Sequence, residues 1–153
     1  MIDDRDRKLL NLLQEDAETP VTQLADQVAL SVSACWRRIR RLAEEGFVRK
    51  RVVVLDRRKM KVPTTIYVLI RTSDHSIRWL ENFRAAMIDI PEIVEAHRLT
   101  GNIDYLLKVV LPDVEHWDEI YKRLVNRTNF FDVSSYISME EMKATNIIPT
   151  SYV

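Results

Sequence analysis

Residues 22–54 read TQLADQVALSVSACWRRIRRLAEEGFVRKRVVV, and this stretch decides the fold of the first half of the chain. It predicts two short helices joined by a tight turn and followed by a basic hairpin. The second of these helices carries several arginines. Such an arrangement can place a helix in the major groove of DNA while a wing contacts the phosphate backbone. We therefore predict a winged helix-turn-helix domain over residues 1–55.

The spacing of apolar residues supports three helices in this domain. The first is expected over residues 4–16, where leucines form one face and three aspartates suit the helix N-terminus. Pro20 separates it from the second helix, and Ser31 is suited to be the N-cap of the third. The third helix has a buried stripe at spacings of three and four, formed by Val32, Cys35, Ile39 and Leu42. Gly46 is expected to end it.

The buried stripe leaves the other face of the third helix for DNA. Arg37 and Arg38 lie near its start, where a guanidinium can bind guanine with two hydrogen bonds. Arg40 and the wing residues are better suited to phosphates, which position the protein without reading sequence. Trp36 could either pack against the first helix or contact DNA. The full set of predicted DNA-binding residues is Ser31, Ser33, Ala34, Arg37, Arg38, Arg40, Arg41, Arg49, Lys50 and Arg51.

The charge of the chain is concentrated in the same region. Net charge is zero overall, but residues 37–61 hold eleven Lys and Arg against three acidic residues, a local charge of +8. The rest of the chain therefore carries −8. A local positive field can bind phosphates by counterion release without making the whole molecule adhesive. A solvated helix face would be the alternative for a basic run without a helix-turn-helix pattern.

The second half of the chain predicts a separate α+β domain. Residues 56–63 are polar and basic and end in Pro63, so we expect a linker there. Over residues 64–153 the apolar periodicity alternates between strand and helix in the order β-α-β-β-α-β, which is the ferredoxin-like arrangement. The expected strands are residues 64–70, 93–99, 103–110 and 133–142, and the helices are residues 74–89 and about 113–124.

A sheet of this kind has one face covered by its own two helices. The other face needs a cover, and pairing with a second copy of the chain is the usual solution. A twofold dimer also suits a helix-turn-helix protein, because two recognition helices can then reach successive turns of double-stranded DNA. We therefore expect a homodimer.

Composition excludes several other classes of protein. The chain is 46% hydrophobic and 30% charged, as expected for a globular protein rather than a disordered one. No apolar run approaches 18 residues and no secretory signal is visible, so we expect a cytoplasmic protein without a membrane partner. One cysteine, Cys35, cannot form an internal disulfide and is most simply a core residue. We find no metal-ligand spacing or catalytic motif, and we expect no metal, cofactor or catalytic residue.

Three segments carry a resemblance to a known family. LADQVALSVSACWRRIRRLAEEGFV, LTGNIDYLLKVVLPD and ISMEEMKATNIIP closely resemble the Lrp/AsnC (feast/famine) transcriptional regulators. The resemblance covers nearly the whole chain in order. It implies an N-terminal winged helix-turn-helix and a C-terminal ferredoxin-like effector-binding domain. It also implies dimers that assemble into tetramers or octamers, and an amino acid or related metabolite as effector.

The resemblance also implies an effector site. The family pattern G-x-x-D-Y stands here as Gly101, Asn102, Ile103, Asp104 and Tyr105, and part of the last strand completes the pocket at a subunit interface. The matching strand positions are Tyr136, Ile137 and Ser138. Backbone N–H groups around a glycine turn can hold a carboxylate, and Asp104 can pair with an ammonium group. A plain hairpin in which Asp104 caps a turn is the alternative.

The chain departs from the family pattern at two places. Ala29 stands where the family often has glycine, and this change is expected to matter little. Residues 128–132 read TNFFD, where many members have a Pro-Gly pair. The identity of the effector is therefore not carried over from the family.

Two other functions remain as alternatives. Siroheme decarboxylases share this two-domain architecture, but they would need histidines gathered in a cleft, whereas His75, His97 and His116 fall on separate predicted elements. An architectural DNA-binding protein without an effector is the second alternative, since a multimer gains avidity from modest individual contacts. The preferred hypothesis is a sequence-specific, effector-responsive regulator.

Overall fold

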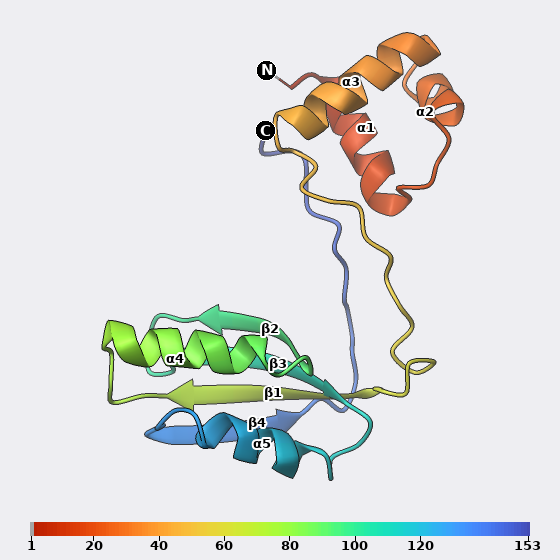
Figure 1. Cartoon of the computed structure of the whole chain (residues 1–153). Coiled ribbons are helices and arrows are strands. Elements are labelled where there is room, and N and C mark those ends of the chain that lie inside the picture. Colours follow the sequence, from red (N-terminus) through yellow and green to blue (C-terminus); the bar gives the residue numbers. More distant parts are fainter. Residues whose placement is uncertain (1) are drawn as a thin grey trace. The chain divides into compact units, whose positions relative to one another are not determined.

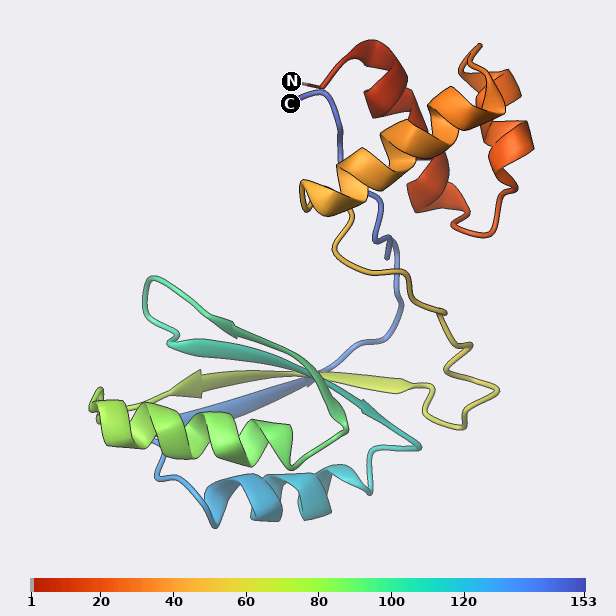
Figure 2. The same cartoon turned by 45° about the horizontal axis from the view of Figure 1, so that its top comes forward.

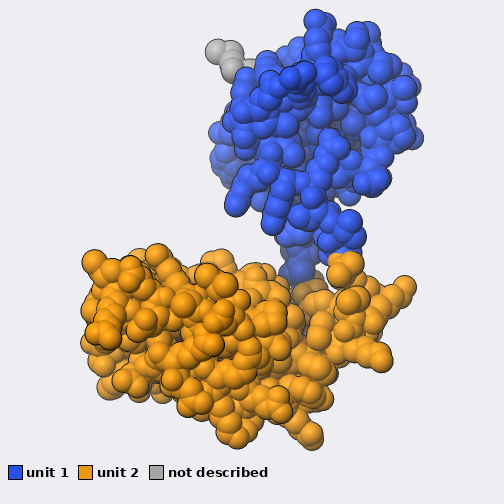
Figure 3. Space-filling view, viewed as in Figure 1, with its two compact units in different colours: residues 1–54, 143–153 blue, residues 55–142 orange. Residues whose placement is uncertain are grey.

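The computed structural model describes residues 2–153, which form two compact units (Figures 1–3). Unit 1 comprises the residues up to Val54 together with Lys143–Val153, and unit 2 comprises Leu55–Met142. No helix in this part of the chain combines the length and the apolar character that a bilayer crossing requires.

Unit 1 contains the three predicted helices, α1 (Asp4–Glu15), α2 (Val21–Gln27) and α3 (Val32–Glu44). Both α1 and α3 begin at side-chain caps. Asp3 and Asp6 form a capping box at α1, and the Ser31 hydroxyl accepts the Ala34 N–H at α3. The helices close around a core of Leu9, Leu10, Leu24, Ala25, Val28, Cys35 and Leu42.

The turn between α2 and α3 requires a left-handed residue. Ala29 has φ +52°, and the Leu30 N–H donates to the Ala25 carbonyl at 2.9 Å to close the turn. An L-residue with a side chain pays a steric cost in this conformation, which glycine avoids. The expectation that alanine matters little at this position therefore overlooked a strained backbone.

The predicted basic hairpin after α3 is not formed. Gly46, at φ +82°, ends the helix as expected, but residues 48–56 contain neither helix nor strand in the described chain. Residues 56–62 then form a tight turn, in which the Val62 N–H donates to the Arg57 carbonyl at 2.9 Å. Arg57 also pairs with Glu141 at 3.2 Å, so the segment predicted as a linker is held within unit 2.

Unit 2 has the predicted β-α-β-β-α-β order. Its elements are β1 (Thr64–Arg71), α4 (Ile77–Ile88), β2 (Ile93–Arg98), β3 (Tyr105–Leu111), α5 (Trp117–Val125) and β4 (Asp132–Ile137). The strands form one antiparallel sheet in the order β2-β3-β1-β4. Figure 2 shows α4 and α5 on the same face of this sheet. The α+β ferredoxin-like fold is therefore confirmed.

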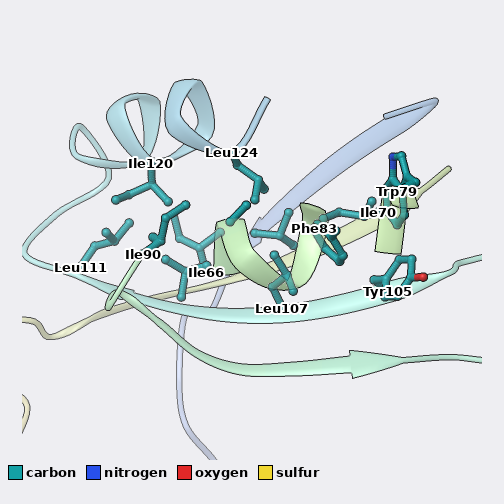
Figure 4. Packing of buried hydrophobic residues seen from close by; sticks show 13 residues of the cluster. Ile66, Ile70, Trp79, Phe83, Ile90, Tyr105, Leu107, Leu111, Ile120 and Leu124 are labelled. Atoms are coloured by element: carbon teal, nitrogen blue, oxygen red, sulfur yellow. The ribbon is translucent and has the colours of Figure 1, made fainter. Parts of the chain in front are cut away.

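The core of unit 2 lies between the sheet and these two helices (Figure 4). Alternate residues of β1 and β3 point toward the helices, because side chains of a strand alternate between its faces. Phe83 packs between Trp79 and Tyr105, with ring centroids at 5.0 and 4.9 Å. The Trp79 indole N–H donates to the Asn129 carbonyl at 2.9 Å, which satisfies the one polar group of that ring.

The boundaries of several elements differ from the prediction: α5 begins at Trp117 rather than near Asp113, and β3 begins at Tyr105 rather than at Ile103. α4 begins at Ile77 rather than near Asp74, because the Ser76 hydroxyl caps it by accepting the Trp79 N–H. β4 ends at Ile137 rather than near Met142. The last residue pair between β4 and β1 is Ile137 with Ile66, followed by one bond from the Ser138 N–H to the Thr65 carbonyl, because β1 itself begins at Thr64.

Residues 143–153 were predicted to belong to the second domain, but they pack on α1 in unit 1. The Gln14 side chain accepts the Ile148 N–H at 2.7 Å and donates to the Ile148 carbonyl at 3.1 Å. Thr150 bonds to Asn11 at 3.0 Å, and Arg7 donates to the Val153 carbonyl at 2.8 Å. Unit 1 is thus built from two separate parts of the chain.

Candidate DNA-binding and effector sites

The exposed face of α3 begins with Ser33 and Arg37. Both side chains are exposed, and Arg37 forms no ion pair within the described chain. Ala34 is half-buried beside them, and Ser31 is occupied as the N-cap. A helix in the major groove uses residues near its N-terminus to reach base edges. Arg37 is therefore the guanidinium of α3 that stays available for a base.

Arg38 and Arg41 are placed differently from the prediction that they point away from the core. Arg38 Nη1 lies 2.6 Å from Asp3 Oδ2 and 2.8 Å from Asp6 Oδ1, and Arg41 Nη2 lies 2.5 Å from Asp6 Oδ2. The Asp6 side chain is only 1% exposed. These two arginines therefore attach α3 to α1. The sequence predicts the aspartates of residues 3–6 only as favourable charges at a helix N-terminus, and no pattern in it indicates this pairing.

The ion pairs also set the titration of this cluster. Burial raises the pKa of the Asp6 carboxyl, but hydrogen bonds from Arg38, from the Asp3 N–H and from Arg41 outweigh burial and lower the pKa below its usual value. The Asp6 N–H and Arg38 similarly lower the pKa of Asp3. The carboxylates are therefore ionised at neutral pH and neutralise part of the positive charge on α3.

The remaining basic residues are on the surface. The Arg40 guanidinium lies 5.5 Å from the centroid of the Trp36 ring and donates to Glu44 at 2.7 Å. Arg49, Lys50 and Arg51 are exposed, although they follow α3 as an irregular segment rather than as a wing hairpin. They remain predicted phosphate contacts.

The candidate effector turn joins β2 and β3. Gly101 has φ +111°, and the Leu99 N–H donates to the Asp104 carbonyl at 2.8 Å, which closes the loop. In the described chain no hydrogen bond is made by the N–H groups of Gly101, Asn102 and Ile103. Free N–H groups around a turn can bind a carboxylate.

Asp104 has a structural role in this turn. Its Oδ2 accepts the Thr72 N–H at 2.8 Å, so the side chain ties the end of β1 to the turn. This contact is the capping role that the sequence offers as the alternative to ligand binding. The other carboxylate oxygen has no protein partner among the described residues, and Asp104 is only half-buried. One residue can therefore support the turn and still face a ligand.

Tyr105 lies mostly inside the core. Its side chain is 6% exposed and packs against Phe83 and Trp79 with centroid distances of 4.9 and 5.5 Å. Figure 4 shows the ring beside these residues, with its hydroxyl pointing away from them. The packing indicates that Tyr105 anchors the turn of residues 101–104 to the core of unit 2.

The second group of predicted effector residues lies at the other end of the sheet. Tyr136 and Ile137 are exposed and Ser138 is half-buried. Ile137 pairs with Ile66, whereas Tyr105 pairs with Ile70 at the opposite end of β1. Four residues of strand separate these levels, about 13 Å. One copy of the chain therefore does not bring the two groups together.

The histidines show no arrangement suited to a cofactor or metal. His75 precedes α4, His97 lies in β2, and His116 precedes α5, where its Nδ1 lies 2.8 Å from an Asp113 carboxylate oxygen. No group of three potential metal ligands occurs in the part of the chain that the structure describes.

Family models match both units. The "winged helix-turn-helix DNA-binding" model matches residues 2–49, and the "Lrp/AsnC ligand binding domain" model matches residues 65–148. The chain belongs to the Lrp/AsnC family. This assignment makes it a member of a family of DNA-binding transcriptional regulators.

Individual members of the Lrp/AsnC family are similar over the full length. The HTH-type transcriptional regulator Zrp of Zymomonas mobilis is 53% identical over 153 residues, which cover all of both chains. An AsnC family transcriptional regulator from Agrobacterium tumefaciens has the same fold, with a TM-score of 0.94, 44% identity and coverage of 99% of both chains. The Neisseria meningitidis regulator NMB0573, solved as a complex with L-Met, also gives a TM-score of 0.94, at 27% identity and 99% coverage of both chains.

Proposed function

We propose that this Lrp/AsnC regulator binds a specific double-stranded DNA sequence through α3 and changes its DNA affinity when an amino acid binds to unit 2. The observation that carries the DNA-binding part is the exposed start of α3 in a chain of this family, where Ser33 is exposed and Arg37 is exposed without an ion-pair partner in the described chain. Arg40, Arg49, Lys50 and Arg51 supply phosphate contacts around it.

The effector site uses the turn of residues 101–104. Its free N–H groups suit a carboxylate, and the unpaired oxygen of Asp104 suits an ammonium group, so together they fit the two charged ends of a free amino acid. The complex of the N. meningitidis regulator with L-Met supports an amino acid as the ligand class. Because Tyr136–Ser138 lie at the other end of the sheet, a second copy of the chain would have to supply them.

The homodimer is supported by two uncovered apolar surfaces. α4 and α5 cover one face of the sheet, and the other face carries Tyr67, Leu69, Leu106, Val110 and Tyr136. The β-branched residues 52–54 are also exposed and have no strand partner in the described chain. A second copy could cover the open face and supply backbone partners to this segment. Tetramers or octamers would then assemble from such dimers.

The test of the dimer is sedimentation equilibrium on three proteins. Tyr67→Asp puts a charge on the open face and should convert the dimer to monomers, whereas Ile88→Asp, on the exposed side of α4, should leave the dimer intact. A Tyr67→Asp protein of unchanged mass would contradict pairing through the open face.

The test of the regulator is fluorescence anisotropy at fixed salt. The probe is DNA from upstream of the gene that encodes the protein, and pooled amino acids are added to it. Binding that one pool shifts supports the proposal, whereas binding that no pool shifts favours an architectural protein. Failure to bind any DNA would reject a DNA-binding regulator.

Two substitutions of Asp104 separate ligand binding from folding. Asp104→Asn keeps an oxygen that can accept the Thr72 N–H but removes the negative charge, so it should abolish the amino-acid response and leave DNA binding intact. Asp104→Ala removes both and should also lower the melting temperature. An Asp104→Asn protein that still responds to the amino acid would place the ammonium group elsewhere.

A further inference from the structure

Trp36 is unusually exposed for a tryptophan. Its side chain is 52% exposed, whereas Trp79 in unit 2 is 6% exposed and its indole N–H is bonded. Tryptophan is on average among the more buried residues because its ring is large and apolar. Packing in the core of unit 1 therefore does not explain why a tryptophan occupies this position.

The position of Trp36 on α3 places it beside the predicted DNA-reading residues. The stripe of Cys35, Ile39 and Leu42 faces the core, and Arg38 faces Asp6 on α1. Trp36 lies three residues after Ser33 and directly before Arg37, on the side of the helix that remains. It is therefore part of the surface that an α3 docked in the major groove would present.

Charged residues surround the ring. The Arg40 guanidinium lies over it at 5.5 Å from the centroid, a distance that favours a cation–π interaction. Lys50 and Arg51 line the same shallow hollow, together with apolar residues such as Val21 and Val48. An apolar surface with a positive rim suits a ligand that combines apolar groups with phosphates, as the edge of a DNA groove does.

We infer that Trp36 and Arg40 act as one DNA-contacting pair. The indole ring contacts a deoxyribose or the edge of a base, and it holds the Arg40 guanidinium against the neighbouring phosphate. This inference rests on the proposed DNA-binding function and adds to it an apolar contact that the basic residues do not provide. Trp36 is thus an apolar DNA-contacting residue of the recognition helix.

The two members of the pair should respond differently to salt. Trp36→Ala removes an apolar contact, so DNA binding should weaken about tenfold while the slope of log K against log salt stays unchanged. Arg40→Ala removes a phosphate contact, so that slope should fall by about one. Trp36→Phe keeps a ring and should lose less affinity than Trp36→Ala. Ile88→Ala removes an exposed apolar side chain from unit 2 and should bind as the wild type does.

Acrylamide quenching of tryptophan fluorescence gives an independent readout. Trp36 is the most exposed of the three tryptophans, since Trp79 is buried and Trp117 is half-buried. Saturation with the upstream DNA should reduce quenching in the wild-type protein and leave it unchanged in Trp36→Phe. Equal quenching of the wild type with and without bound DNA would overturn the contact.

The remaining outcomes separate this inference from the proposed function. Wild-type affinity in Trp36→Ala, together with a loss in Arg37→Ala, would overturn the pair and leave the DNA-binding function standing. A wild type that binds no DNA would overturn the function and the pair together. A melting temperature that falls sharply in Trp36→Ala but not in Arg37→Ala would assign the ring to packing, which also overturns the inference.

Discussion

Arg37 and Arg38 are adjacent in sequence but have opposite surroundings. Arg37 is exposed and unpaired in the described chain, whereas Arg38 donates to both Asp3 and Asp6. The difference follows from helix geometry, since neighbouring residues on an α-helix are separated by about 100° around its axis. The Arg37 guanidinium can therefore bind DNA while the Arg38 guanidinium stabilises the packing of α3 on α1.

Replacing each of these arginines by alanine should separate binding from stability. Arg37→Ala should cost about 1–3 kcal/mol of DNA-binding free energy with an unchanged melting temperature. Arg38→Ala leaves a buried carboxylate with one partner fewer and should lower the free energy of unfolding by about 1–3 kcal/mol. DNA anisotropy and urea titration check the two effects.

Cys35 provides a control that reports on unit 1 alone. Its thiol is buried, and burial raises its pKa, so it should resist thiol reagents in the native protein. Arg38→Ala should speed its labelling and Arg37→Ala should not. Equal labelling rates in both variants would mean that Arg38 does not secure α3.

The Asp3–Asp6 cluster predicts a loss of stability in acid. The folded-state pKa of each carboxyl is lowered, so the stabilisation is fully present above the unfolded value of about 3.9 and is lost as the pH falls through the folded value. Urea titrations should show constant stability from about pH 7 to 5 and a decline below about pH 4. Asp6→Asn should be less stable at neutral pH and show a shallower acid decline. An identical acid decline in this variant would assign the effect to other carboxyls.

Individual side chains were harder to predict than the helices that carry them. Helical periodicity identified most of the buried stripe of α3, because it depends only on spacing along one element: Cys35, Ile39 and Leu42 pack in the core, but Val32 at the start of the helix is 43% exposed. The pairing of Arg38 with Asp6 joins two helices 32 residues apart, and a single sequence contains no signal for that distance. For the same reason the sequence could not decide whether Trp36 packs against α1 or faces DNA, because its exposure depends on which elements pack beside it.

At the scale of elements, the turn between α2 and α3 combines a required conformation with an unsuitable residue. Ala29 has φ +52°, a left-handed conformation that costs a side-chain-bearing residue about 1–2 kcal/mol. Glycine removes this strain but makes the unfolded chain more flexible, which offsets part of the gain. The net balance favours glycine.

We therefore expect Ala29→Gly to raise the free energy of unfolding by about 0.5–1 kcal/mol. Urea titration is the measurement. Gly46→Ala is the matched control at the end of α3: its added Cβ would meet no atom within 4 Å, so the backbone strain at φ +82° should lower stability by about 1 kcal/mol. A destabilised Ala29→Gly protein would mean that the alanine side chain contributes packing that outweighs the strain.

The elements themselves were largely predictable, and their ends were not. The order of helices and strands in unit 2 followed from the change between strand and helix periodicity. The predicted wing hairpin failed because residues 48–56 have strand-like composition but no partner strand in the described chain. A high strand propensity means that a residue fits well into a sheet, but a strand forms only where a neighbouring strand is available to pair with it.

At the scale of the whole molecule, the chain passes from unit 1 to unit 2 and returns. Residues 143–153 pack on α1 through contacts that include Gln14 with Ile148 and Asn11 with Thr150. The sequence pattern could not predict that these residues pack on α1, because the segment has little periodicity of its own. The segment begins a few residues after β4 and the candidate effector residues Tyr136–Ser138.

Deleting residues 143–153 should therefore destabilise unit 1 although the deletion lies outside the helix-turn-helix sequence. Each hydrogen bond contributes about 0.5–1.5 kcal/mol, so we expect a loss of about 1–3 kcal/mol and faster labelling of Cys35. Gln14→Ala removes two of the same bonds and should give a smaller change in the same direction. Unchanged Cys35 labelling in both proteins would mean that the segment does not support α1.

The return of the chain also has a consequence for biosynthesis. Ribosomes make α1, α2 and α3 first, but the residues that complete the surface of α1 emerge only after all of unit 2 has been translated. A nascent chain that stops before residue 143 carries the recognition helix without the segment that packs on α1. The packing of unit 1 is therefore completed only after unit 2 has been synthesised.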